Sequence, residues 1–331
     1  MKIINRLIFL IVIAAGLYGF YYIQYGGNPV DRGDKYLKKM KYDKAISEYL
    51  KEIENRKNEK IEPDNELLLK IADTYEKLEK YESAIPYFKL ILKRKKDHLQ
   101  AQFGLAFNLY KGNFKGAKKE FNDLLRLVPS HSLGNYYLAK IFLGNENYSS
   151  ALKHLKMAKD TDDSNIEIYK LISIIYKHKK NIEAGIDICE EGIKINPECS
   201  ELYSNLGFFY ILDKEYEKGR KECNTAIGLD YKSAQARHHL GLCCFGTKLI
   251  DAAEKQFEEA LKNREDYPLP HYMLGIIEFQ KKNFKKSLEH YEKALEIVKE
   301  HKKTKNFYYS PELIPSIKKG IESIKKLKSS R

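Results

Sequence analysis

The chain has 331 residues, of which 32% are charged, and its formal net charge is +13. Only nine basic residues are arginine, the side chain suited to forked phosphate recognition, and the lysines interleave with 46 acidic residues. Basic clusters such as 93–96, 302–305 and 325–328 are therefore predicted to be solvated faces, and nucleic acid is not an expected partner. The five cysteines, an odd number without a C-x-x-C pair, exclude a disulfide-stapled small domain.

The first predicted element is a transmembrane helix over residues 7–25, after a short basic leader at 1–6. The span holds 19 residues without a charge, and as a helix it would be about 28 Å long against a hydrocarbon core of ~30 Å. Tyrosines gather at its far end, where an aromatic belt would lie. A cleaved signal peptide is the alternative, but the apolar run continues well past Ala14-Ala15-Gly16, the small-residue site. We expect an uncleaved single-pass anchor.

Basic residues flank the predicted span on both sides, so the positive-inside rule is nearly balanced. A short basic leader that abuts the apolar run favours an extracytoplasmic, periplasmic location for the rest of the chain. The expected location is therefore the cell (inner) membrane. The cytoplasmic orientation remains open, and the cysteines do not decide between the two.

Residues 26–300 carry a 34-residue period of small side chains. A fixed period of this size indicates stacked helix–turn–helix units, in which two helices cross closely at the small residues. About eight units fit between residues 28 and 300, the first of them degenerate. The recurring small residues are Ala84, Ala117, Ala151, Gly185, Gly219, Ala253 and Ser287.

Two places depart from this period. The first and second units are 39 residues apart, so the charged segment 55–65 is predicted to insert a longer loop and to act as a joint. In the third unit Leu105 stands in the small-residue column with Gly104 one place early, which predicts an irregular turn.

Residues 301–331 are predicted to contain a linker, a capping helix over 311–328 and a basic tail. Solenoids need a terminal cap with a polar outer face. The helix has one apolar stripe and could instead fold back into the groove of the array or pack against another protomer. The stripe consists of Ile314, Ile317, Ile321, Ile324 and Leu327.

Several columns of the period agree at once in two successive units. They include Tyr203, Leu206, Gly207, Tyr210, Tyr216, Gly219 and Ala226 in one unit, and Leu240, Gly241, Ala253, Phe257 and Ala260 in the next. In these columns the chain resembles the tetratricopeptide repeat (TPR) family. The chain departs from the family in having no tryptophan and in keeping the unit-closing proline only at Pro129 and Pro197. The resemblance implies an all-α, right-handed superhelical solenoid of about eight repeats that binds proteins.

In this family the first helix of each unit lines a concave groove. Carried onto this sequence, the groove becomes apolar and aromatic in repeats six to eight, and Asn205 stands where members often hydrogen-bond a ligand backbone. The family's carboxylate clamp of Lys, Asn and Arg is not matched. The predicted partner-binding residues are Asn205, Phe208, Ile211, Gln235, His238, Leu242, Phe245, Tyr272, Ile276 and Phe279.

No catalytic constellation emerges from the sequence. There is no phosphate-cradling glycine loop, nucleophile elbow or zinc-ligand spacing. The His238-His239 pair cannot face one ion, because adjacent helical residues point about 100° apart; one imidazole is expected in the groove and the other in the core. We therefore expect no enzyme activity, no cofactor and no metal.

The expected function is that of a membrane-anchored scaffold whose concave groove recruits protein partners. Its setting would be a bacterial-type envelope complex, such as an assembly of the flagellar-motor kind. The alternatives are a chaperone-like adaptor that holds envelope proteins and a regulatory subunit of a membrane enzyme. Association between copies of the chain is left open, as is the identity of the partner.

Overall fold

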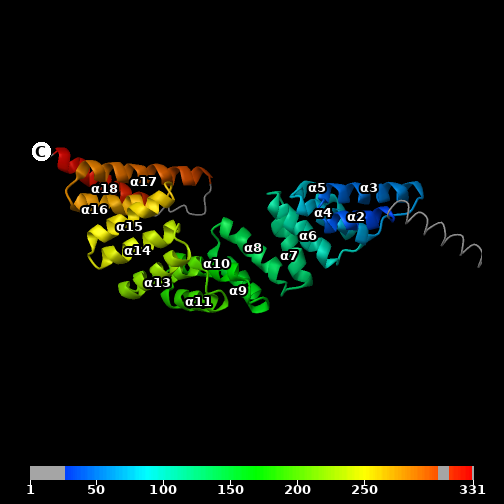
Figure 1. Cartoon of the computed structure of the whole chain (residues 1–331), viewed down its shortest axis with the longest axis horizontal. Helices are drawn as coiled ribbons and strands as arrows, with labels where there is room; N and C mark the ends of the chain where they lie inside the picture. Colours follow the sequence, from blue (N-terminus) through cyan, green and yellow to red (C-terminus); the bar gives the residue numbers. More distant parts are fainter. Residues whose placement is uncertain (1–26, 305–312, 330–331) are drawn as a thin grey trace, which may run out of the picture. The chain divides into compact units, whose positions relative to one another are not determined.

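The computed structural model describes residues 27–304 and 313–329, and this part of the chain is all helical (Figure 1). The predicted leader 1–6 and anchor 7–25 lie outside the described residues. Within the described ranges, no helix combines the length and the apolar character needed to cross a bilayer.

The described helices fall into two compact units, with the boundary after Ile141. The first unit holds α2 (Pro29–Lys38), α3 (Tyr42–Asn58), α4 (Asn65–Lys77), α5 (Tyr81–Arg94), α6 (Leu99–Lys111) and α7 (Ala117–Leu127). Helix α8 (Ser132–Gly144) runs across the boundary. The second unit holds α9 (Tyr148–Thr161), α10 (Ile166–Lys179), α11 (Ile182–Ile195), α12 (Ser200–Leu212), α13 (Tyr216–Leu229), α14 (Ala234–Gly246), α15 (Ile250–Asn263), α16 (Pro268–Gln280), α17 (Phe284–Thr304) and α18 (Leu313–Ser329).

Within each unit the helices pack as hairpins that stack on one another. Helices α2, α4 and α6 pack against the helix that follows each of them, and α10, α12, α14 and α16 do the same in the second unit. The second helix of a hairpin then contacts the first helix of the next, as α11 does with α12 and α13 with α14. This arrangement is an all-helical solenoid, and it confirms the helix–turn–helix reading of the period.

The small-residue columns lie where two helices approach most closely. A Cβ atom added at Gly207 on α12 would lie 2.6 Å from Cys223 Sγ and 3.1 Å from the Gly219 carbonyl oxygen. At Gly241 on α14 it would meet the ring of Phe257 at 2.6 Å. These separations are too short for a carbon atom in a close-packed interior, so the columns are fixed by packing.

Each hairpin turn also contains one residue in the left-handed backbone conformation. The small-residue columns of the sequence do not predict these positions. In the turn from α14 to α15, Lys248 has φ 63°. There the Leu249 backbone N–H donates to the Cys244 carbonyl oxygen at 2.8 Å, which closes the helix end. The equivalent residues are Met40, Glu79, Asn113, Glu146, Lys180, Lys214 and Lys282.

Lys248→Gly is expected to stabilise the protein by up to about 1 kcal/mol, because glycine removes the left-handed strain at a small cost in unfolded-state entropy. The urea midpoint would measure this change. Lys248→Ala, which keeps the strain, should give no gain. Equal midpoints for the two variants would contradict the prediction.

The predicted insertion is only partly a loop. Helix α3 continues to Asn58, and 59–64 connect it to α4. Arg56 pairs with Glu52 at 2.8 Å and with Asp64 at 2.7 Å. The longer-loop prediction fails for 55–58, which continue α3, and for Asn65, which begins α4. Arg56 and Lys57 in the first stretch are good helix formers.

The irregular turn of the third repeat is confirmed. Helix α7 starts at Ala117, three residues later in its unit than the equivalent second helices. Gly116 precedes it with φ 104°, a conformation that glycine adopts without strain. Gly104 takes the close-packing role: its added Cβ would meet the Phe88 ring at 2.4 Å.

Helix α18 packs on α17 as the predicted terminal cap. Ile317 and Ile324 are fully buried in a cluster with Tyr291 and Ala294, whereas Leu327, the last residue of the predicted stripe, is 42% exposed. The preceding helix runs to Thr304, four residues beyond the predicted end of the solenoid.

Candidate protein-binding face

The ten predicted partner-binding residues lie on the first helices α12, α14 and α16 of three successive hairpins. Asn205 and His238 are buried, and the other eight are half-buried. The set therefore divides by burial into residues that a partner could touch and residues that support them.

His238 does not line an open surface. It is 3% exposed and packs between Phe257 and Tyr267, with ring centroids 5.5 and 5.3 Å away. Burial lowers the pKa of His238 to about 3, helped by nearby Lys177 and Arg264. Its placement differs from the predicted groove position because the imidazole fills space between the two rings of its own repeat.

Its neighbour His239 is also buried, so both imidazoles are core residues. Its Nδ1 lies 2.9 Å from the Ser204 carbonyl oxygen and 3.0 Å from the Ser204 hydroxyl. Since a carbonyl only accepts, Nδ1 carries the proton. Burial, followed by the charge of Lys177, holds the pKa of His239 well below its usual value.

Asn205 is the centre of a hydrogen-bonded row that crosses α10, α12 and α14. Its Nδ2 donates to Ser173 Oγ at 2.8 Å, and its Oδ1 accepts from Gln235 Nε2 at 2.9 Å and from Lys177 Nζ at 3.1 Å. We call Ser173, Lys177, Asn205 and Gln235 the polar ladder. It fixes the side chains of three successive repeats in one register.

Local sequence places the ladder. Helix α10 begins where the Asn165 side chain accepts from the Glu167 backbone N–H, and α14 begins where Ser233 accepts from the Ala236 N–H. Helix α12 contacts both α10 and α14. The three helices therefore present their ladder residues to one another.

Lys177 joins the ladder to the apolar part of the predicted face. Its Nζ lies 4.8 Å from the ring centroid of Phe208, within cation–π range. Burial lowers the pKa of Lys177 to about 8, which the Cys189 thiol partly opposes. Lys177 and Ser173 are not among the predicted site residues, since a serine in a small-residue column signals packing and a lysine on a mixed face signals solvent.

The apolar side chains of the predicted set are each partly exposed and partly packed in the core. Ile211, Leu242 and Phe245 are half-buried and pack against the cluster around Phe257 and Leu274. Each thus keeps part of its surface for a partner while the rest is tied to the solenoid.

Tyr272, Ile276 and Phe279 pack against the cluster formed by α17 and α18. Tyr272 contacts Tyr291 at 6.0 Å between ring centroids, and Phe279 contacts Phe284 at 5.6 Å. The apolar side chains of the last repeat are therefore joined to the terminal cap, and the part of the predicted set most available to a partner lies on α12 and α14.

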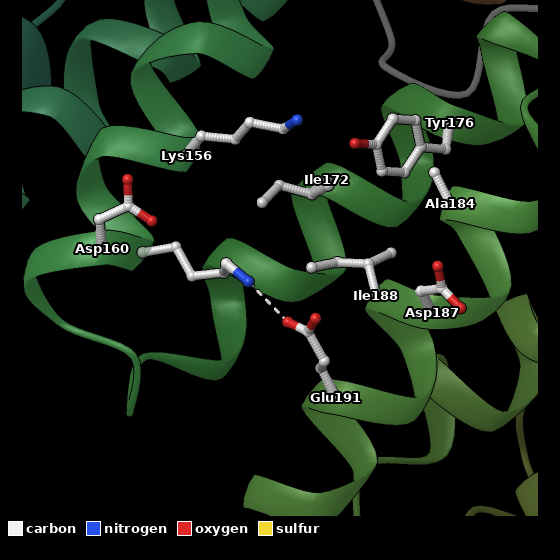
Figure 2. A pocket seen from close by; sticks show the side chains of 9 residues that line it. Lys156, Asp160, Ile172, Tyr176, Ala184, Asp187, Ile188 and Glu191 are labelled. Carbon is white, nitrogen blue, oxygen red and sulfur yellow. Dashed lines mark hydrogen bonds and ion pairs between the residues drawn. The ribbon is translucent and has the colours of Figure 1, made fainter.

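A cleft of about 340 Å³ lies elsewhere in the second unit, between α9 and α11. Figure 2 shows Ile172 and Ile188 at its centre and charged side chains around them. Lys159 and Glu191 bridge it with an ion pair of 2.6 Å. This ion pair already occupies two of the charged groups that a ligand would use, which makes the cleft a weaker candidate than the ladder. In the described part of the chain, no three His, Cys, Asp or Glu side chains are placed to share a metal ion.

Comparisons with known proteins agree with this architecture. Sequence models described as tetratricopeptide repeat match residues 66–98, 109–166, 166–199, 234–267 and 268–301. The chain belongs to the tetratricopeptide repeat family. As a TPR protein it has the class of fold that supports protein–protein interaction.

Among curated relatives, this TPR protein is 28% identical over 130 residues to the BBSome complex member BBS4 of Bos taurus, covering 39% of this chain and 25% of the relative. It is 22% identical over 194 residues to the mitochondrial import receptor subunit TOM70 of Homo sapiens, covering 56% and 31%. The chain thus spans a third or less of these relatives.

Among solved structures, the crystal structure of the APC/C hetero-tetramer Cut9–Hcn1 superposes with a TM-score of 0.54 at 13% identity, over 77% of this chain and 50% of that one. At this identity the likeness shows the fold alone.

Proposed function

We propose that this TPR protein is a scaffold that binds protein partners through the face formed by α10, α12 and α14. The observation that carries the proposal is the polar ladder. A row of hydrogen-bonding side chains across three repeats can hold an extended backbone, while half-buried Phe208, Leu242 and Phe245 anchor its side chains. The protein would act by binding, without a cofactor or chemistry of its own.

The setting of the scaffold is proposed from the sequence. The uncharged segment 7–25 would anchor it in the inner membrane, with the repeats outside the cytoplasm. Such a protein would organise partners in a bacterial-type envelope complex. A chaperone-like adaptor and a regulatory subunit of a membrane enzyme use the same face and differ in the partners that they bind.

Site-specific photocrosslinking of the full-length chain in its native membrane tests the proposal. Benzoylphenylalanine at Leu242 is expected to capture one or two dominant partners, identified by mass spectrometry. The same probe at Lys221, whose side chain is 81% exposed on the second helix of its repeat, is the control. A diffuse set from Leu242 would favour the adaptor, and capture from Lys221 alone would contradict the assigned face.

A further inference from the structure

Two lysines on α10 have opposite surroundings. Lys170 Nζ lies 2.8 Å from Glu167 Oε1 and 2.9 Å from Glu201 Oε1. Lys177 follows seven residues later, nearly two helical turns, so the two side chains project from the same side of the helix. No aspartate or glutamate of the described residues lies within ion-pair distance of the Lys177 ammonium.

The contacts that Lys177 does make are neutral. One of its three N–H donors is taken by Asn205 Oδ1, and the Phe208 ring lies beside it. The nearby imidazoles of His238 and His239 are held uncharged by burial. A largely covered ammonium without a counter-ion is unfavourable. Lys170, on the same helix, has two carboxylates beside it, Glu167 of α10 and Glu201 of α12.

We propose that Lys177 binds the side-chain carboxylate of an aspartate or glutamate in the partner, placed between the Phe208 ring and the polar ladder. This inference rests on the proposed function and names the chemistry of the ligand. Lys177 retains two N–H donors for the carboxylate oxygens, and none of its contacts is an arginine that could fork a phosphate.

An internal acidic residue is favoured over a chain terminus for a physical reason. A segment that continues beyond Lys177 can contact Phe208 on one side and the ion-paired Lys170 and Glu201 on the other. A terminal carboxylate would leave one of these two contacts unused.

Selection from a random 16-residue peptide library displayed on phage tests the inference, with the detergent-held full-length chain as bait. Its inserts are internal to the coat protein, so any carboxylate selected comes from a side chain. Wild type and Lys170→Met are expected to enrich peptides with Asp or Glu at one fixed position relative to an apolar anchor. Lys177→Met is expected to lose that preference.

Affinity measurements complete the test. The best peptide, synthesised with both ends blocked, should bind wild type at least about tenfold more weakly after Glu→Gln substitution, and Lys177→Met should show no such loss. Lys177→Met should melt no earlier than wild type, because methionine removes an uncompensated charge at similar volume.

The outcomes separate the two proposals. Enrichment of no peptide at all would overturn the proposed binding face and the inference with it. Three other results would overturn the inference alone. The enriched peptides could lack a fixed acidic position, or they could need a free C-terminal carboxylate to bind. The third is that Glu→Gln substitution weakens binding to Lys177→Met as much as binding to wild type.

Discussion

Gly207→Val is expected to destabilise the second unit by about 3 kcal/mol, although valine is normally the better helix former. A Cβ at this position would lie 2.6 Å from Cys223 Sγ and 3.1 Å from the Gly219 carbonyl oxygen. The backbone carbonyl cannot rotate away, so α12 and α13 must separate. Because a repeat is stabilised by its neighbours, the hairpins on either side should loosen as well. Urea unfolding followed by circular dichroism would measure the loss.

Gly228 on α13 provides the matched control. A Cβ built there has no atom within 4 Å, so Gly228→Ala should be neutral or stabilising by up to about 1 kcal/mol. A Gly207→Val variant as stable as wild type would show that the hairpin tolerates wider spacing, and that the small-residue column has another cause.

Acid is expected to weaken the second unit through the adjacent buried histidines His238 and His239. The pKa of His238 is lowered to about 3 and that of His239 well below its usual value, in both cases by burial first. The unfolded chain therefore binds protons that the folded chain rejects. The contribution of the two histidines to the free energy of unfolding is therefore highest above about pH 6.5, the pKa of a histidine in the unfolded chain. It decreases as the pH falls toward the pKa values of the folded state, by up to about 1.4 kcal/mol per pH unit for each histidine.

Urea midpoints at pH 7.5, 6.0 and 5.0 would measure the start of this loss, which should begin near pH 6.5 and grow steeper toward pH 5. His238→Leu combined with His239→Asn removes both titrating groups, so its midpoint should change less over the same range. Identical pH slopes in the two proteins would show that other groups cause the acid sensitivity.

The periodic columns predicted the fold because their cause is local. Gly207, Gly241 and Gly275 recur every 34 residues since each repeat packs only against its neighbours, and the structure places them at the crossings that the period implies. The predicted insertion was less successful: residues 55–58 break the period but continue α3, and only the connection to α4 is irregular.

Site residues were harder to predict, because helical position tells which way a side chain starts and not what surrounds it. Asn205 was recognised from its position in the repeat, and it is the centre of the ladder. His238 has a similar position, but the space between Phe257 and Tyr267 takes its ring into the core.

The sequence by itself determined the repeat length, the helical hairpins and the terminal cap. It could do so because small and apolar residues at period 34 allow one kind of stacking. Only the tertiary structure decided that Lys170 meets two carboxylates and Lys177 none, and that α18 takes up the apolar side chains of the last repeat. Apart from the Lys170–Glu167 pair within α10, these features depend on contacts between different helices, such as Lys170 with Glu201, 31 positions apart. The repeat pattern does not encode such contacts.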